Sequence, residues 1–94
     1  MMKTITKHRL LPDVRDPQIV RLPRLAKAIG VIASFSEEQG LTLDLYALAN
    51  PGNALCDRRF VVTTTEWFDA SRAKYVGTAS LREGQFVYHV LEWV

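Results

Sequence analysis

Few side chains in this sequence could act as a nucleophile or as a base. Cys56 is the single cysteine, and His8 and His89 are the two histidines. Nucleophilic catalysis needs the nucleophile and its base in one place, and nothing in the sequence brings either histidine to Cys56. The two arginines after Asp57 favour the thiolate, whereas Asp57 itself opposes it. We therefore interpret Cys56 as a small apolar residue at the start of a strand, and we expect no catalytic residue and no enzyme activity.

Metal and phosphate sites are not indicated either. A metal site needs three or four His, Cys or carboxylate ligands at workable spacing, and the two histidines lie far apart in the chain. There is no glycine-rich phosphate loop and no Gly-x-Ser-x-Gly motif. His89 lies between Tyr88 and Val90 in a strand-like run, which favours a half-buried structural side chain. We expect no metal and no cofactor.

Large side chains in a connection give the best indication of binding. Trp67 and Phe68 are adjacent in a segment that reads as a loop, and Trp and Arg are enriched at the centres of protein interfaces. The alternative is that Trp67 or Phe68 closes the open end of the fold. Trp93, near the C-terminus, is either a core residue or a dimer contact, and the last strand could pair with a neighbour's edge. The predicted binding residues are Trp67, Phe68, Arg58, Arg59 and Arg72.

Length and composition indicate a single domain over residues 1–94. One cysteine allows no intrachain disulfide, which fits a reducing compartment. No apolar run approaches the roughly 18 residues that span a bilayer, and the N-terminus lacks the apolar region of a secretion signal. We therefore expect a cytoplasmic protein with no membrane contact.

Charge is unevenly distributed along the chain. Residues 1–30 hold seven basic and two acidic side chains, whereas residues 31–94 hold five basic and eight acidic ones. The basic segment could attract an acidic partner. The interpretation that we favour is a solvated face on edge strands, where Lys and Arg discourage aggregation.

Apolar residues recur with the period of two that is typical of β-strands. Strands are predicted at 4–11, 18–22, 29–35, 41–49, 58–65, 73–81 and 85–94, with Pro23 marking an edge. Segment 25–28 is either one helical turn or a continuation into the next strand, and segment 66–72 is either a loop or one helical turn. Asp44 would lie within a strand and would need an arginine partner from a neighbouring one. We predict an all-β fold of six or seven strands, either a compact antiparallel sandwich or a partly closed barrel.

The last two strands predict a hairpin with a defined register. Arg82 and Glu83 suit a type I turn, and Gly84 suits the left-handed position of a three-residue bulged loop. That loop sets Lys74 opposite Glu92, Tyr75 opposite Leu91 and Val76 opposite Val90, and each such pair stabilises the hairpin by roughly 0.2–1 kcal/mol.

Several short motifs resemble those of a family of small uncharacterised proteins, about 90 residues long, that phages and prophages encode. They are F-D-A at 68–70, Y-V-G-T at 75–78, L-R-E-G at 81–84 and V-Y-H-V-L-E at 87–92, with K-T-I at 3–5, L-L-P-D-V at 10–14, D-P-Q at 16–18 and L-P at 22–23 near the N-terminus. The chain differs from the family in a longer central hairpin, in Tyr46 where the family has Trp, and in T-T-T-E at 63–66 where it has Gly-Thr-Gly. The resemblance implies origin and fold, and it brings no catalytic residue and no ligand.

Three functions are consistent with these features. The first is a non-catalytic phage or prophage accessory protein that binds a host protein in the host cytoplasm, as inhibitors of bacterial defence such as anti-CRISPR proteins do, with a homodimer as one possible state. The second is an oligomeric binder of a small anionic ligand such as a nucleotide signal, because guanidinium groups match phosphate oxygens. The third is a minor structural protein of a virion. Sequence-specific nucleic-acid binding is less favoured, because there is no helix-turn-helix pattern and the net charge of +2 is low.

Overall fold

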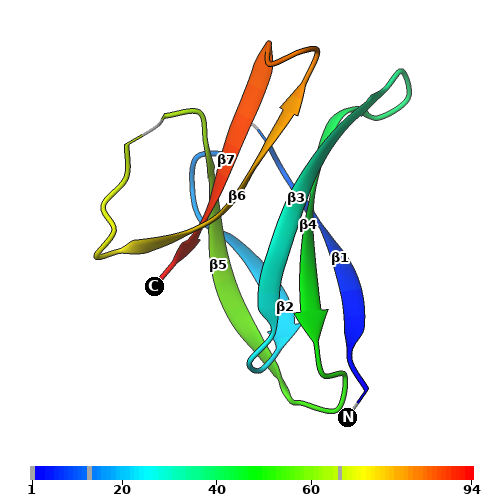
Figure 1. Ribbon diagram of the computed structural model, residues 1–94, viewed down its shortest axis with the longest axis vertical. Coiled ribbons are helices and arrows are strands. Elements are labelled where there is room, and N and C mark those ends of the chain that lie inside the picture. The colour runs from blue at the N-terminus through cyan, green and yellow to red at the C-terminus, as the bar shows by residue number, and fades with distance from the viewer. Residues whose placement is uncertain (1, 13, 66) are drawn as a thin grey trace.

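Two antiparallel β-sheets pack face to face (Figure 1). The computed structural model describes residues 2–12, 14–65 and 67–94. A three-stranded sheet has the order β1-β4-β3, and a four-stranded sheet has the order β2-β5-β7-β6. The strands are β1 (Thr4–Leu10), β2 (Gln18–Pro23), β3 (Lys27–Ser36), β4 (Gly40–Ala49), β5 (Leu55–Thr63), β6 (Ala73–Leu81) and β7 (Phe86–Trp93). The predicted all-β class is confirmed, and the two sheets form an open sandwich and not a closed barrel.

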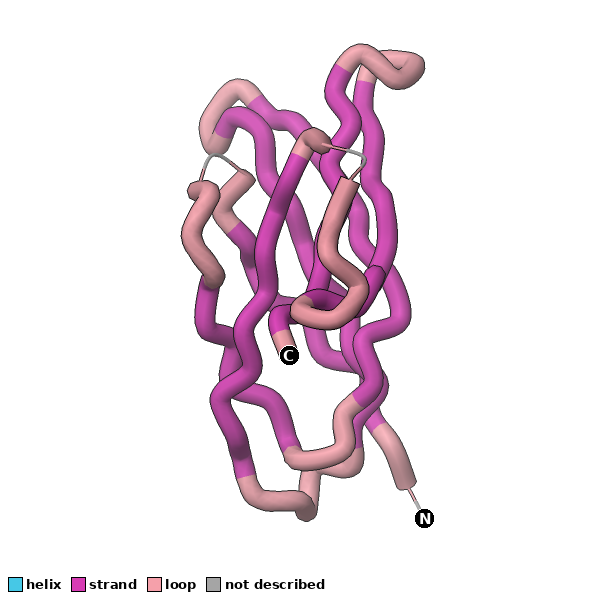
Figure 2. The backbone as a smooth tube through the Cα atoms, turned by 90° about the vertical axis from the view of Figure 1, so that its left-hand side faces the viewer, coloured by secondary structure: helices cyan, strands magenta, loops and turns pink. Residues whose placement is uncertain are grey.

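None of the described residues is helical. The helical turn considered at 25–28 is absent, and the described part of 66–72 is a loop; Glu66 itself lies outside the described residues. The described chain therefore has no helix long and apolar enough to cross a membrane. Figure 2 shows that most of the chain runs up and down the long axis as strands.

The core lies between the sheets and follows the alternation of β4, the central strand of its sheet. Leu43 and Leu45 are fully buried, and Ala47 and Ala49 follow them on the same face. Phe60 of β5 and Val90 of β7 are fully buried in the four-stranded sheet. Because strand side chains alternate between faces, these residues determine which of their neighbours point outward.

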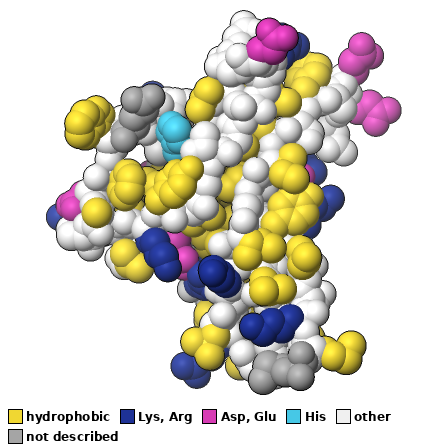
Figure 3. Space-filling model, in the orientation of Figure 1, with side chains coloured by type: hydrophobic (Ala, Val, Ile, Leu, Met, Phe, Trp, Pro, Cys, Tyr) yellow, Lys and Arg dark blue, Asp and Glu magenta, His cyan; other side chains and the backbone are white. Residues whose placement is uncertain are grey.

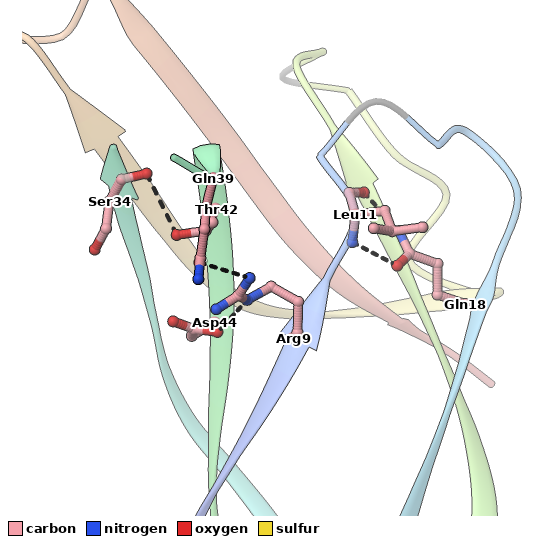
Figure 4. A network of polar contacts seen from close by, with 7 residues as sticks. All are labelled: Arg9, Leu11, Gln18, Ser34, Gln39, Thr42 and Asp44. Carbon is pink, nitrogen blue, oxygen red and sulfur yellow. Dashed lines mark hydrogen bonds and ion pairs between the residues drawn. The ribbon is translucent and has the colours of Figure 1, made fainter. Parts of the chain in front are cut away.

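Asp44 lies on the outer face of β4 and has the arginine partner that it needs. Arg9 is opposite Asp44 on β1, and its Nε donates a hydrogen bond to Asp44 Oδ1 at 2.9 Å (Figure 4). Asp44 is buried, so this pairing offsets the cost of placing a carboxylate there. The expected ion pair is confirmed, with the partner on the first strand of the chain.

One hydrogen-bonded contact joins the two sheets where β1 ends. The Leu11 backbone N–H donates to Gln18 Oε1, and Gln18 Nε2 donates to the Leu11 carbonyl, both at 2.7 Å (Figure 4). The side-chain amide thus takes the place of a backbone neighbour. It links β1 to β2 although these strands belong to different sheets.

A β-bulge in β3 changes the predicted faces of that strand. The register with β4 shifts between Ala28 and Gly30, so Ile29 is the extra residue and is 47% exposed. The alternation of residues 29–35 in the sequence predicts one apolar face made of Ile29, Val31, Ala33 and Phe35. Of these four, Val31 and Ala33 pack against the core, whereas Phe35 is 56% exposed near the end of the strand. The prediction is wrong for Ile29 because the bulge inserts one residue and inverts the alternation before Gly30.

The β6–β7 hairpin has the predicted register at its base, but its bulge lies within β6 and not at the turn. Lys74 pairs with Glu92 and Tyr75 with Leu91, as expected, but Gly77 and not Val76 pairs with Val90. The bulge is at Val76, between Tyr75 and Gly77, and not at the turn. The predicted pairing of Val76 with Val90 is therefore wrong.

The turn of this hairpin also differs from the prediction. Arg82 and Glu83 have φ values of 52° and 55°, and Gly84 has φ of 90°. Positive φ at Arg82 and Glu83 excludes the type I turn that we expected. Glu83 and Gly84 instead occupy the centre of a tight turn, which the Gln85 N–H closes by donating to the Arg82 carbonyl at 3.1 Å. Gly84 does have the predicted positive φ.

Gly77 shows why the bulged segment carries a glycine. The sheets approach each other closely where β6 lies beside β3 (Figure 1). A Cβ on Gly77 would lie 3.2 Å from Val31 Cγ2, which is tighter than ordinary contacts. The missing side chain therefore permits the approach of the two edges.

The C-terminal strand is interior and cannot pair with a neighbour's edge as we had considered. Trp93 of β7 is opposite Arg59 of β5 on one side and Ala73 of β6 on the other. The edges of the four-stranded sheet are β2, as Pro23 predicted, and β6. The basic N-terminal strands β1 and β2 are both edge strands. This agrees with the interpretation that their Lys and Arg side chains are solvated and discourage aggregation.

A bidentate ion pair joins β5 to β7 on the inner face. Arg58 Nε donates to Glu92 Oε2 at 2.6 Å and Arg58 Nη2 donates to Glu92 Oε1 at 2.7 Å. Arg58 Nη1 also donates to the carbonyl of Ala26, just before β3. The hydrogen bond to Glu92 is the main cause of a raised Arg58 pKa. The side chains are only 19% and 16% exposed, so each depends on the other for its charge to be satisfied.

Replacing Glu92 by Gln should lower the free energy of unfolding by about 3 kcal/mol, because it leaves a largely buried guanidinium without its counter-charge. The double variant Arg58→Met with Glu92→Leu should recover most of that loss, because it removes both charges and keeps apolar volume. Urea unfolding followed by tryptophan fluorescence measures both. The matched control is Arg21→Met at the exposed Arg21–Asp57 pair, which should cost less than about 1 kcal/mol; equal losses in Glu92→Gln and the control would contradict the role of the buried pair.

Candidate interaction surface

The connection between β5 and β6 is ordered by its own polar side chains. Thr63 Oγ1 accepts a hydrogen bond from the Thr65 N–H at 3.1 Å, and Thr65 Oγ1 accepts one from the Trp67 N–H at 3.3 Å. Asp69 Oδ1 accepts from the Ser71 N–H at 2.9 Å and from its hydroxyl at 2.6 Å. Thr, Asp and Ser favour such local turns over a regular strand. The described residues 64, 65 and 67–72 therefore form a structured loop beside the four-stranded sheet (Figure 1).

Trp67 and Phe68 lie differently in this loop. Trp67 is 87% exposed and Phe68 is 44% exposed. Phe68 lines a groove with Leu91, which lies on the outer face of β7 and is nevertheless buried. Neither aromatic ring fills the space between the sheets, so the alternative that one of them closes the end of the sandwich is not supported.

A groove of about 300 Å³ runs between the loop and the outer face of the four-stranded sheet. It contains three of the five predicted binding residues, Trp67, Phe68 and Arg72, and adds Trp93 to them. The lining residues are Val61, Thr63, Thr65, Trp67, Phe68, Asp69, Arg72, Ala73, Leu91 and Trp93. We call this groove and its rim the loop surface.

A hydroxyl and imidazole chain continues the loop surface along the sheet. The Tyr75 and Thr78 hydroxyl oxygens lie 2.6 Å apart, and Thr78 Oγ1 lies 2.8 Å from His89 Nδ1. These residues share a hollow of about 230 Å³ with Phe68 and Leu91. His89 is half-buried and hydrogen-bonded, as the sequence predicted.

The arginines predicted to bind divide between the two faces. Arg59 is opposite Trp93 on β5 and β7, which places it on the outer face with the loop surface. Arg72 lines the groove, and its Nε lies 3.8 Å from Asp69 Oδ2. Arg58 has the opposite orientation and is held by Glu92 on the inner face. The structure therefore makes Arg58 a structural residue, because adjacent residues of a strand point to opposite sides.

The residues considered for nucleophilic chemistry lie in different places. Cys56 pairs with Leu22 in the four-stranded sheet, whereas His8 belongs to β1 of the three-stranded sheet and its Nε2 lies 2.9 Å from Thr6 Oγ1. Burial lowers the His8 pKa. None of the hydrogen bonds found among the described residues joins Cys56 to a histidine.

A larger hollow lies at the end of β5, next to the loop surface, and none of the predicted binding residues lines it. Its volume is about 580 Å³, and its lining includes Tyr88 and the charged side chain of Arg15. The remaining lining residues are Pro12, Val14, Val61, Val62, Thr63, Thr64 and Thr65. Three threonines and one arginine make this hollow the more polar of the surfaces near the loop.

Leu91 and Trp93 belong to the loop surface, and Tyr75 lines the hollow that continues it, but none of the three was among the predicted binding residues. The alternation of β7 places His89, Leu91 and Trp93 on one face, and this signal was visible in the sequence. The sequence does not show whether that face of β7 points into the sandwich or out of it. A buried side chain such as Leu91 would be assigned to the core, and only the position of the loop shows that it lies outside the sandwich.

Comparison with known proteins gives one match. A family model described as "Domain of unknown function (DUF7352)" matches residues 1–94. No curated protein and no solved structure matches the chain.

Replacing Ser71 by Ala should raise the Asp69 pKa toward its ordinary value, because the Ser71 hydroxyl is the main cause of its lowering. The Ser71 N–H still donates, so the rise should be partial. Since the folded pKa lies below the unfolded one, the loop gains stability from Asp69 above the unfolded pKa and loses it as pH falls through the folded value. Carboxyl-carbon NMR titration measures the pKa, with Ser80→Ala on β6 as control; an unchanged Asp69 pKa in Ser71→Ala would contradict the assignment.

Proposed function

This chain belongs to the DUF7352 family, a family of unknown function, and from that premise we propose that it is a non-catalytic module that binds a partner protein on its loop surface. The observation that carries the proposal is the exposure of Trp67, which is 87% accessible and lies in a groove with a second tryptophan, Trp93. An exposed tryptophan beside other large apolar side chains is typical of a protein interface.

The chemistry of the loop surface supports a protein partner. Phe68, Trp67 and Trp93 supply aromatic area, and Arg59 and Arg72 supply charge at its rim. Aromatic residues and arginine are the side chains that contribute most to binding at the centre of interfaces. The loop that carries Trp67 is already ordered by Thr65 and Asp69, which lowers the entropy lost on binding.

The sequence resemblance to phage and prophage proteins supports a host protein as the partner. In that role the chain is an accessory protein that binds to a host protein and blocks a site on it. Inhibitors of bacterial defence such as anti-CRISPR proteins are one class of protein that acts in this way. A small domain with an aromatic surface is sufficient for such a function, because occupation of a site needs no chemistry.

Replacing Trp67 by Ala should weaken the partner complex by about 30-fold or more, as loss of an interface anchor worth about 2 kcal/mol does. Affinity capture from a lysate of a defence-bearing host, followed by calorimetry with the purified partner, measures the effect. Ile5→Ala is the matched control, because Ile5 is exposed on β1 of the other sheet and should leave binding unchanged. Equal binding by wild type, Trp67→Ala and Trp93→Ala would exclude the loop surface as the interface.

The hollow beside Arg15 favours a second function, the binding of a small anionic ligand such as a nucleotide. Arg15 and three threonines are among the residues that line about 580 Å³ of space, and guanidinium and hydroxyl groups match phosphate oxygens. Isothermal titration with AMP and with inorganic phosphate tests it. Arg15→Ala should abolish any heat of binding, whereas the control Arg24→Ala, at an exposed arginine, should not. If the wild-type protein shows no heat of binding with either ligand, this function is rejected.

A further inference from the structure

The tips of two hairpins enclose an apolar pocket at one end of the molecule. The β3–β4 and β6–β7 hairpins project toward the same end (Figure 1). Between them lies a pocket of about 190 Å³ lined by Phe35, Leu41, Leu81, Arg82 and Phe86. We call it the tip pocket. It shares no residue with the loop surface or with the hollow beside Arg15.

The protein's own Arg82 side chain lies against both aromatic rings of the tip pocket. Its Cζ is 5.4 Å from the centroid of the Phe35 ring and 5.7 Å from that of the Phe86 ring. Both distances are within the range of cation–π attraction. Among the described residues Arg82 has no ion pair with a carboxylate, so the two rings are its main charge-stabilising partners. The pocket is therefore suited to a guanidinium group.

The backbone that holds Arg82 in this position is unfavourable. Arg82 and Glu83 both have φ near +50°, a conformation that residues other than glycine seldom adopt. Such conformations cost free energy and persist only where surrounding contacts maintain them. The turn fixes the backbone position from which the Arg82 side chain reaches the two rings, and a rotation of the side chain away from the rings leaves that turn unchanged.

The charge around the tip pocket favours a cation. Glu37 and Glu38 lie in the β3–β4 turn, and Glu83 lies in the β6–β7 turn next to Arg82. Figure 3 shows acidic side chains on both hairpin tips with hydrophobic side chains between them. Carboxylates flanking a concave apolar site raise the local concentration of cations and repel anions.

We propose that the tip pocket binds an arginine side chain from a partner protein, and that in the free protein Arg82 lines this pocket and covers the ring faces on which the partner's guanidinium would stack. A guanidinium is planar and weakly hydrated, so it stacks on aromatic rings better than a lysine ammonium does. The space of about 190 Å³ that is free beside Arg82 is of the size of one side chain. The occupant enters from a basic segment of the partner and displaces Arg82, and the acidic turns provide complementary charge.

The experiment is an NMR titration of the Phe35 and Phe86 ring signals with the blocked peptide acetyl-Gly-Arg-Gly-amide. In Arg82→Ala the faces of the Phe35 and Phe86 rings are no longer covered by the protein's own guanidinium, so the affinity for the peptide should exceed that of the wild type by about threefold or more. Replacing Phe86 by Ala in the same background should abolish the effect. Arg82→Gly should behave like Arg82→Ala, and glycine adopts the positive φ of this position without strain. It therefore replaces Arg82→Ala in the titration if the alanine variant folds poorly.

Three controls decide the outcome. The neutral peptide with citrulline in place of arginine should not bind, and Trp67→Ala combined with Arg82→Ala should bind as Arg82→Ala does, which separates this pocket from the loop surface. The proposal is overturned if Arg82→Ala gains no affinity, if citrulline binds equally well, or if the affected signals lie outside the tip pocket. Ring signals that shift with protein concentration alone would make the occupant a second copy of this chain and would likewise reject a partner's arginine.

Discussion

The inner faces of the two sheets can be buried only against each other, and this constraint determines what the protein displays. Phe60 and Val90 are fully buried between the sheets. Since strand side chains alternate, Arg59 and Val61 must then face outward on β5, and His89, Leu91 and Trp93 must face outward on β7. The loop surface is therefore a consequence of core packing: the same residues that stabilise the sandwich determine which aromatic and charged side chains remain outside it.

Two β-bulges adapt the strands to this packing. In β3 the bulge moves Ile29 to the exposed side and leaves Val31 toward the core. In β6 the bulge at Val76 changes the register between the tip of the hairpin and its base. It also brings Gly77 against Val31, where a side chain would be crowded. The bulges let the β3 and β6 edges lie side by side, and the tip pocket is enclosed by the hairpins to which these two strands belong.

Charged residues serve different purposes on the two faces. Arg58 is paired with Glu92 inside and also contacts the Ala26 carbonyl, so it joins β5, β7 and the segment before β3. Arg59, its neighbour, faces outward beside Trp93. Acidic residues lie on the hairpin tips and basic ones on the edge strands β1 and β2. The loop surface therefore has aromatic side chains with arginines at its rim, whereas the tip pocket has acidic side chains around it. The two sites should prefer partners of opposite charge.

The sequence by itself determined most of the strands and the positions of their turns, because period-two alternation, proline and glycine act locally, and it marked the β5–β6 connection as a candidate binding loop. It predicted that Asp44 needs an arginine and that Gly84 has a positive φ, and it proposed Trp67, Phe68 and Arg72 as binding residues, which the structure places along one groove. It could not assign Arg58 and Arg59 to opposite faces with different roles, locate the bulge at Val76, or place Leu91 outside the core. Those features depend on which face of each strand meets the other sheet, and the tertiary structure alone decides this, because a one-residue bulge inverts a strand's faces without leaving a distinct local signal.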